Sequence, residues 1–171
     1  MSAHVHMIAG LTGAGKSTYA EGLRRDVSAA RFSIDDWNAV LFFPDRDPAS
    51  DFEWFYERVQ RCCAVMRATA EHLLEAGQPV VFDCGFTNLH ERTIFYDWAD
   101  ALGVPVTLHF IDVPTDVRWD RTQQRNADRG ATFALHVTRE MFDFMEGIWE
   151  APKPDELSAR NGIIFPDPEP R

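Results

Sequence analysis

One short segment restricts the fold of this chain more than any other: GLTGAGKS, from Gly10 to Ser17. It fits the pattern G-x-x-x-x-G-K-S/T, in which a glycine-rich turn joins a strand to a helix and holds phosphate groups. The context fits, because the apolar run HVHMIAG predicts a buried strand, and a helix is expected from Ser17 to about Ser28. Glycines let the turn direct its N–H groups at phosphate oxygens, and the helix N-terminus adds positive charge. The segment therefore predicts a phosphate-binding loop (P-loop) for a nucleoside triphosphate.

Each position of the P-loop has an expected contact. Lys16, one of only two lysines in a chain of net charge −10, should reach the β- and γ-phosphates. The Ser17 hydroxyl should ligate Mg²⁺, and Thr18 should lie near the adjoining phosphate. The motif predicts ATP and Mg²⁺ as ligands, and does not separate ATP from GTP. The residues expected to contact the nucleotide here are Thr12, Gly13, Ala14, Gly15, Lys16, Ser17 and Thr18.

The rest of the chain alternates short apolar runs with helical periodicity. The runs RFSI, PVVFD and VPVTLHFIDV predict further strands, and residues 163–165 could form a fifth. Helices are expected from Phe52 to Leu74, from about Leu89 to Leu102, from Pro114 and Thr115 to Gly130, and from about Ala134 to Glu150. Alternation of this kind favours a parallel sheet with helices on both faces. The expected fold is a three-layer α/β P-loop NTPase of the nucleoside-kinase type, with four to five strands.

Length and composition set the remaining limits. A chain of 171 residues predicts one domain, here residues 1–150 with a lid at about 115–133, followed by a C-terminal tail at 151–171 that could form one short strand and is then expected to be loose. The pI near 4.9 disfavours long nucleic acid as a partner, and the end of a nucleic-acid strand is kept as an alternative partner. Neither a signal peptide nor a membrane-spanning run is recognisable, so a cytoplasmic location is expected. The three cysteines predict small buried side chains rather than disulfides or a zinc site.

Missing motifs narrow the class of P-loop protein. The chain has no N/T-K-x-D segment, which GTPases use to read the base, and no LSGGQ-like segment of ABC-type ATPases. It is also too short for a ring-forming mechanical ATPase with a helical lid domain. A small kinase remains, and such an enzyme needs a base for the acceptor, an acid for the metal and a cationic lid.

Two adjacent acids are candidates for the acceptor side. Asp35 and Asp36 follow the second expected strand, at the sheet end where ligands of parallel sheets bind. One of them could take the proton of an acceptor hydroxyl, and we assign this role to Asp35. The alternative is that Asp35 caps a helix whose Trp37 and Val40 cover the core.

Two other acids compete for the metal. Asp83 ends the strand VVFD, and Asp112 ends LHFID, so either could orient the water ligands of Mg²⁺. We favour Asp83 because the third strand usually lies beside the P-loop strand in small kinases. Asp112 is then expected to cap the helix that starts near Pro114.

Four arginines predict the lid. Arg118, Arg121, Arg125 and Arg129 are spaced three, four and four residues apart, so they share one helical face. Like charges on one face repel, which favours a role in holding anions over simple solvation, although a solvated face with ion pairs is the alternative. We expect Arg121 and Arg125 to contact the nucleotide, and Arg125 and Arg129 to stabilise the transferred phosphoryl group.

The segments IDDW, DCGFTNLHER, IDVP and RNADRG, together with the P-loop, resemble a group of P-loop kinases. This group contains polynucleotide 5′-hydroxyl kinases, zeta toxins and chloramphenicol phosphotransferases, often filed as an AAA-type ATP-binding domain. The resemblance covers residues 5 to about 149 and implies that Asp35 is the general base and that Arg125 and Arg129 belong to the lid. It further implies that Asp83, Asn88 and Arg92 lie near the metal and the acceptor.

One departure from the phage polynucleotide kinase pattern concerns the acceptor. That pattern has an arginine two residues after the second acid, and here the position holds Asn38, which cannot clamp a phosphate by charge. Nearby aromatic residues could form a slot for a ring-bearing compound or could belong to the core. They are Trp37, Phe42, Phe43, Trp54 and Phe55. Asp36, Trp37 and Asn38 are the remaining expected acceptor contacts.

These features together predict an ATP-dependent transfer of the γ-phosphoryl group to a hydroxyl of a small-molecule or nucleoside-like acceptor. One alternative is a polynucleotide 5′-hydroxyl kinase. Another is a nucleotide-binding switch protein without an acceptor, which would not need the paired acids Asp35 and Asp36.

Overall fold

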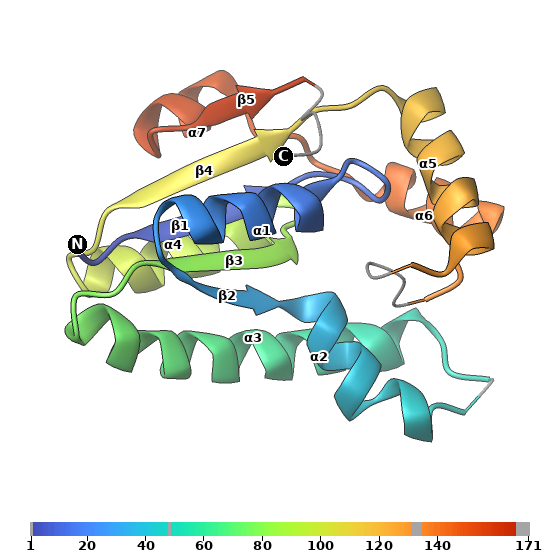
Figure 1. Ribbon diagram of the computed structural model, residues 1–171, viewed down its shortest axis with the longest axis horizontal. Helices are drawn as coiled ribbons and strands as arrows, with labels where there is room; N and C mark the ends of the chain where they lie inside the picture. The colour runs from blue at the N-terminus through green and yellow to red at the C-terminus, as the bar shows by residue number, and fades with distance from the viewer. Residues whose placement is uncertain (1, 48, 131–134, 167–171) are drawn as a thin grey trace.

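A five-stranded parallel sheet organises the chain, in the order β2-β3-β1-β4-β5. The computed structural model describes residues 2–47, 49–130 and 135–166. The strands are β1 Val5–Ala9, β2 Ala30–Ser33, β3 Val80–Gly85, β4 Val106–Ile111 and β5 Ile163–Phe165. Figure 1 shows that all five point the same way. The expected parallel α/β fold is confirmed, and residues 163–165 form its fifth strand.

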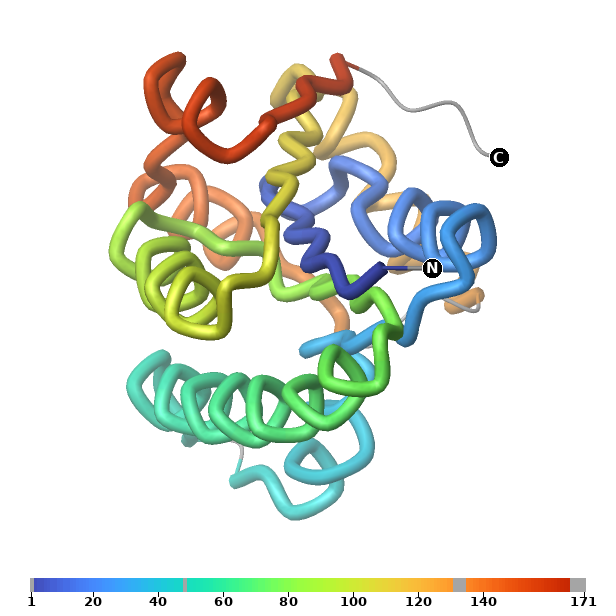
Figure 2. Tube along the Cα trace, turned by 90° about the vertical axis from the view of Figure 1, so that its left-hand side faces the viewer, coloured from blue at the N-terminus to red at the C-terminus, as the bar shows by residue number. Residues whose placement is uncertain are grey.

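Helices cover both faces of the sheet. Helix α1 packs on one face and helices α3 and α4 on the other, as the two views in Figures 1 and 2 show. Helices α5 and α6 stand beyond the ends of the strands, where α2 also begins (Figure 1). The helices are α1 Lys16–Asp26, α2 Ile34–Leu41, α3 Phe52–Glu75, α4 Leu89–Ala101, α5 Thr115–Asp128, α6 Arg139–Gly147 and α7 Pro154–Ala159, with a 3₁₀ turn η1 at Phe43–Asp45.

The central strands β1, β3 and β4 are mostly apolar because helices cover both faces of the sheet. Met7 and Phe82 belong to the larger core cluster beneath α3 and α4, whereas Ile8 and Val81 belong to the cluster beneath α1. All four side chains are fully buried. This alternation fixes β1 and β3 at the centre of the molecule and holds the P-loop, which follows β1, in a defined place.

Helix α2 follows β2 without a loop. A helix was expected here only as the alternative to a base role for Asp35. Its N-cap residue is Ser33, whose hydroxyl accepts a hydrogen bond from the Asp36 N–H at 3.3 Å. Asp35 therefore lies inside the first turn and does not cap the helix. Val40 is 75% exposed, so its expected place over the core is also wrong.

The C-terminal part differs most from expectation. Helix α6 begins at Arg139, after the Thr138 cap, whereas a start near Ala134 was expected; Ala134 lies outside the described residues. Helix α7 was not expected, and together with β5 it attaches residues 154–165 to the sheet. Of the tail that was expected to be loose, residues 167–171 lie outside the described part.

Within the described residues, no helix combines the length and the apolar character needed to cross a membrane.

Candidate active site

The P-loop is held in its turn by close packing against helix α5. Gly13 has φ +81°, and a Cβ at this position would clash with the carbonyl oxygen of Arg118 and lie 2.7 Å from Thr122 Oγ1. Gly15 has φ +88° and is the N-cap residue of α1. Only glycine combines this backbone conformation with this close approach. The glycine at position 13 is therefore required by the packing of the P-loop against α5.

Lys16 lies at the centre of a charged cluster. Its Nζ donates a hydrogen bond to the Leu11 carbonyl at 2.9 Å, within the P-loop itself. Removal from water lowers the pKa of Lys16, whereas the negative charges of Asp83 and Asp35 oppose this shift. The positive charge of Arg125 lowers it further. The charge of Lys16 therefore interacts with those of Asp35, Asp83 and Arg125.

Asp35 projects from the first turn of α2 toward this cluster. Although the residue reaches solvent, the surrounding protein displaces enough water to raise the pKa of its carboxyl group. Lys16 opposes the shift, and Asp83 adds to it. A carboxyl group with a raised pKa near a cleft is a candidate for proton transfer.

Asp83 is the buried acid of the site. Only 3% of its side chain is exposed, and it accepts a hydrogen bond from Arg31 Nη2 at 2.7 Å. The other terminal nitrogen of Arg31 lies 3.4 Å from Asp36, so one arginine of β2 pairs with two acids. Sequence reasoning missed Arg31. The sequence signal that could have identified it is a single charged residue within a short strand whose other residues are uncharged.

The choice between Asp83 and Asp112 needs more than strand order, because β3 and β4 both neighbour β1. Of the acids that act on the charge of Lys16, Asp83 has the largest effect. Asp112 is exposed, and the N-cap residue of α5 is Pro114 without a side-chain cap, so the expected capping by Asp112 is wrong.

The four arginines of α5 have unequal positions. Arg118 is buried and donates to the carbonyl oxygens of Val113 at 2.8 Å and Thr12 at 3.3 Å, and to Glu146 at 2.6 Å. It fastens α5 and α6 to the P-loop and is not a free lid cation. Arg125 is half-buried and its Nε has no hydrogen-bond partner within the described chain. The remaining two are Arg121, half-buried, and Arg129, exposed at the C-cap of α5.

Asn88 and Arg92 have local structural partners. The Asn88 side chain caps α4 by accepting a hydrogen bond from the Glu91 N–H at 2.9 Å. Arg92 is 1% exposed and donates to Glu156 and to the carbonyls of Phe86 and Glu150. The structure therefore does not support Arg92 as an acceptor contact, because its guanidinium anchors α7 instead.

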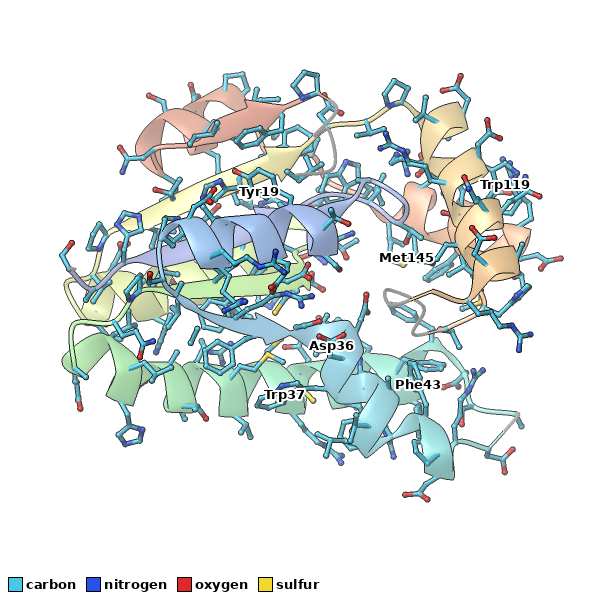
Figure 3. All side chains as sticks on the ribbon, viewed as in Figure 1. Tyr19, Asp36, Trp37, Phe43, Trp119 and Met145 are labelled. Atoms are coloured by element: carbon cyan, nitrogen blue, oxygen red, sulfur yellow. The ribbon has the colours of Figure 1, made fainter. Side chains whose placement is uncertain are left out.

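The side chains of Trp37 and Asn38, which follow Asp36, are both largely removed from solvent. Trp37 packs against the core, with its ring centroid 6.3 Å from that of Phe32, and Figure 3 shows it on the α3 side of α2, opposite Asp36. Asn38 is 7% exposed, and its Oδ1 has no partner within the described residues. Trp37 is better described as a core residue than as an acceptor contact.

The other aromatic residues form a cluster between η1 and α3 rather than a slot. Phe43 and Trp54 both meet the ring of Phe55, with centroids 5.9 and 5.1 Å away. Arginines cover this cluster, since Arg46 lies 4.6 Å above Phe55 and Arg58 lies 3.7 Å above Trp54. Figure 3 labels Phe43 here and Met145 on α6, across from Asp36.

The fold and the charged cluster define a P-loop protein of the kinase-like class. A family model described as an AAA domain matches residues 5–148, and the chain belongs to this family. The resemblance to small P-loop kinases is thereby confirmed. No protein with a curated description matches the chain.

Solved structures share this fold at low sequence identity. Kti12 of Chaetomium thermophilum with ADP-AlF3 has a TM-score of 0.72 and 15% identity, with 95% of this chain and 88% of that chain covered. A gluconokinase from Sinorhizobium meliloti 1021 has a TM-score of 0.66 and 15% identity, with 98% of this chain and 84% of that chain covered. The APS kinase CysC of Mycobacterium tuberculosis, in complex with AMPPNP and APS, has a TM-score of 0.57 and 18% identity, with 75% of this chain and 73% of that chain covered. At these identities the likeness concerns the fold alone.

Proposed function

We propose that the protein is an ATP-dependent phosphotransferase that moves the γ-phosphoryl group to a hydroxyl of a small-molecule or nucleoside-like acceptor. The observation that carries this proposal is the convergence of Lys16, Asp35, Asp83 and Arg125 at one end of the sheet. A protein that only binds nucleotide needs the P-loop and the lysine. It does not need a carboxyl group of raised pKa beside them.

In the proposed reaction, Asp35 accepts the proton of the acceptor hydroxyl as its oxygen attacks the γ-phosphorus. A raised pKa makes Asp35 a better match for this proton than an ordinary aspartate. Lys16 and Arg125 stabilise the charge that spreads over the phosphoryl oxygens, and ADP leaves on the P-loop side. Arg121 and Arg129 are the further lid residues of the proposal.

The oxygen donors present suit Mg²⁺, which usually takes one or two protein ligands and completes its shell with phosphates and water. Ser17 and Asp83 are the residues that would hold it, and the Arg31 bond fixes the orientation of the Asp83 carboxylate. When bound, the ion would neutralise charge on the β- and γ-phosphates. Within the described residues, no cluster of three or more acidic, histidine or cysteine side chains could bind a metal by itself.

Features around Asp35 favour an acceptor without a phosphate. Arg31 is engaged by Asp83 and Asp36, and the buried amide at Asn38 carries no charge. Asp36 and Asn38 are therefore proposed as contacts for neutral hydroxyl groups. The net charge of −10 also opposes the approach of a long polyanion.

The test is coupled detection of ADP with ATP, Mg²⁺ and a panel of nucleosides, antibiotics, sugars and 5′-hydroxyl oligonucleotides. Stimulation by a small alcohol, lost in Lys16→Ala, supports the proposal. Labelling of oligonucleotide alone would identify a strand-end kinase instead. Bound ATP that stays intact for hours with every compound would identify a nucleotide switch.

A further inference from the structure

The two thiols of Cys63 and Cys84 meet below the active site. Cys63 lies on α3 and Cys84 on β3, and both line one small pocket of about 20 Å³. The Cys84 thiol donates a weak hydrogen bond to the Met66 sulfur at 3.9 Å. Cys62 is buried and does not line this pocket. All three cysteines are free.

The surroundings make these two thiols unequal. Arg67 follows Cys63 by one helical turn and lines the same pocket, with its guanidinium 4.9 Å from the centre of the Phe95 ring. Within the described residues, this guanidinium makes no hydrogen bond or ion pair, so its charge is left to act on its neighbours. The neighbouring Cys84 thiol, and then the positive charge of Arg67, lower the pKa of Cys63, whereas burial and Glu91 oppose this shift.

Cys84 lines the same pocket as Cys63 and Arg67, so its thiol is placed beside the Cys63 sulfur. A thiol next to a cation suits the attacking role, and a neighbouring thiol can resolve the sulfenic acid that forms on it. The pocket has room for a water-sized molecule beside both sulfurs.

We propose that Cys63 and Cys84 are an oxidation site at which hydrogen peroxide forms an intramolecular disulfide. The Cys63 thiolate attacks one peroxide oxygen, the O–O bond breaks, and hydroxide leaves and becomes water by taking a proton. The Cys84 sulfur then displaces the hydroxyl group of the Cys63 sulfenic acid, and a second water leaves with the Cys84 proton. Two thiols lose two electrons, and peroxide is reduced to two waters.

The proposed disulfide would join two elements that border the active site. Cys84 directly follows Asp83 in β3, and Cys63 lies in the middle of α3. A disulfide would tie the end of the strand that carries the buried acid to the helix that borders η1 and α2. The inference does not depend on the proposed reaction, because it concerns the thiols alone.

Peptide mapping of the folded full-length protein tests the site. Trypsin cleaves after Arg61, Arg67 and Arg92, so Cys63 and Cys84 fall on separate peptides, while Cys62 shares that of Cys63. Brief treatment with hydrogen peroxide should reduce the free thiols from three to one in the wild type and from two to none in Cys62→Ser. The two peptides should then migrate as one disulfide-linked species in both proteins.

Two variants separate the roles. Cys84→Ser should stop at the sulfenic acid, which dimedone traps on Cys63, and Cys63→Ser should form no cross-link with Cys84. The inference is overturned if all three thiols survive peroxide or if Cys63→Ser cross-links as fast as the wild type. It is equally overturned if the linkage forms only after unfolding in urea.

Discussion

The guanidinium of Arg31 on β2 lies 2.7 Å from the buried carboxylate of Asp83 on β3. Because β2 and β3 are paired so that Ser33 lies beside Asp83, this contact crosses between neighbouring strand ends. Arg31 also reaches Asp36 at 3.4 Å. Asp83 and Asp36 therefore share one arginine, whereas in the described part of the chain no ion pair with Arg31 is found for Asp35, which lies near Lys16.

This division of charge predicts different effects for two adjacent substitutions. Asp35→Asn should lower kcat by a factor of about 10² to 10⁴, because the acceptor would lose its base while ATP still binds. Asp36→Asn is the matched control and should change kcat by less than about tenfold. Steady-state kinetics with the acceptor found in the panel and calorimetry with ATP measure both effects. Equal activity of Asp35→Asn and wild type would show that the base lies elsewhere.

The lid arginines should also differ. Arg125 acts on the charges of both Lys16 and Asp35, whereas Arg129 stands exposed at the C-cap of α5. Arg125→Ala should lower kcat by a factor of about 10² to 10³, the range for one lost oxyanion donor. Arg129→Ala should have a smaller effect. Reversal of this order in single-turnover kinetics would mean that Arg129 swings over the phosphoryl group when the substrates bind.

A glycine pair tests the packing of the P-loop against α5. Gly13 and Gly103 both have positive φ, +81° and +66°, but only Gly13 has atoms where a Cβ would be. Gly103→Ala should cost about 1 kcal/mol of unfolding free energy from backbone strain alone. Gly13→Ala should cost more and should weaken ATP binding at least about tenfold, because the loop must move away from Arg118 and Thr122. Urea unfolding and calorimetry measure the two quantities, and equal effects of both variants would refute the close approach.

The sequence was most informative where one residue type is required by local geometry. The P-loop glycines and the apolar strands predicted the sheet, because burial on both faces leaves little choice of side chain. Helix α2 was harder to predict because it begins at Ile34 with no loop after β2, and Ser33 is its cap. Helix α7 depends on contacts with residues 60 and 64 positions earlier, chiefly those of Glu156 with Tyr96 and Arg92.

The same distinction applies to the site. Lys16, Asp35 and Asp83 could be chosen because each lies at or after the C-terminal end of a strand, where parallel sheets bind ligands. Arg31 could not, because its role depends on the strand register that brings Asp83 beside β2. Arg92 was misplaced, since the sequence does not reveal that its guanidinium points inward to Glu156.

Buried histidines predict a loss of stability in mild acid. His6 Nδ1 lies 3.0 Å from His109 Nε2, and the Tyr19 hydroxyl lies 2.8 Å from His109 Nδ1. Burial, with the charge of neighbouring histidines, lowers the pKa of His6 to about 4 and that of His109 to about 3. The unfolded chain therefore binds more protons below about pH 6.5, so acid favours unfolding.

The expected loss from these two histidines is about 2–4 kcal/mol between about pH 7 and pH 4.5, after allowance for water at His6. Urea unfolding across this range, compared with the His6→Gln/His109→Gln variant, isolates their share from that of the carboxylates. The variant should have a flatter pH dependence. Parallel curves for both proteins would show that the pair keeps its ordinary pKa values in the folded state.

The buried pair of Arg92 and Glu156 gives the last prediction. Arg92 Nε lies 2.6 Å from Glu156, and both side chains are at least nine-tenths buried. Arg92→Met should lower the free energy of unfolding by about 3 kcal/mol, because it leaves the Glu156 charge without its partner. Arg160→Ala is the matched control. It removes an arginine from the more exposed Asp100 and should cost less than about 1 kcal/mol.

Kinetics distinguish this anchoring role from the acceptor contact that the sequence suggested. At a temperature where Arg92→Met is fully folded, kcat and the KM for the acceptor should stay within about twofold of wild type, since the guanidinium is turned toward α7. A large rise in acceptor KM with unchanged stability would return Arg92 to the site. The two measurements together therefore decide between a residue that holds the C-terminal helix and one that binds the substrate.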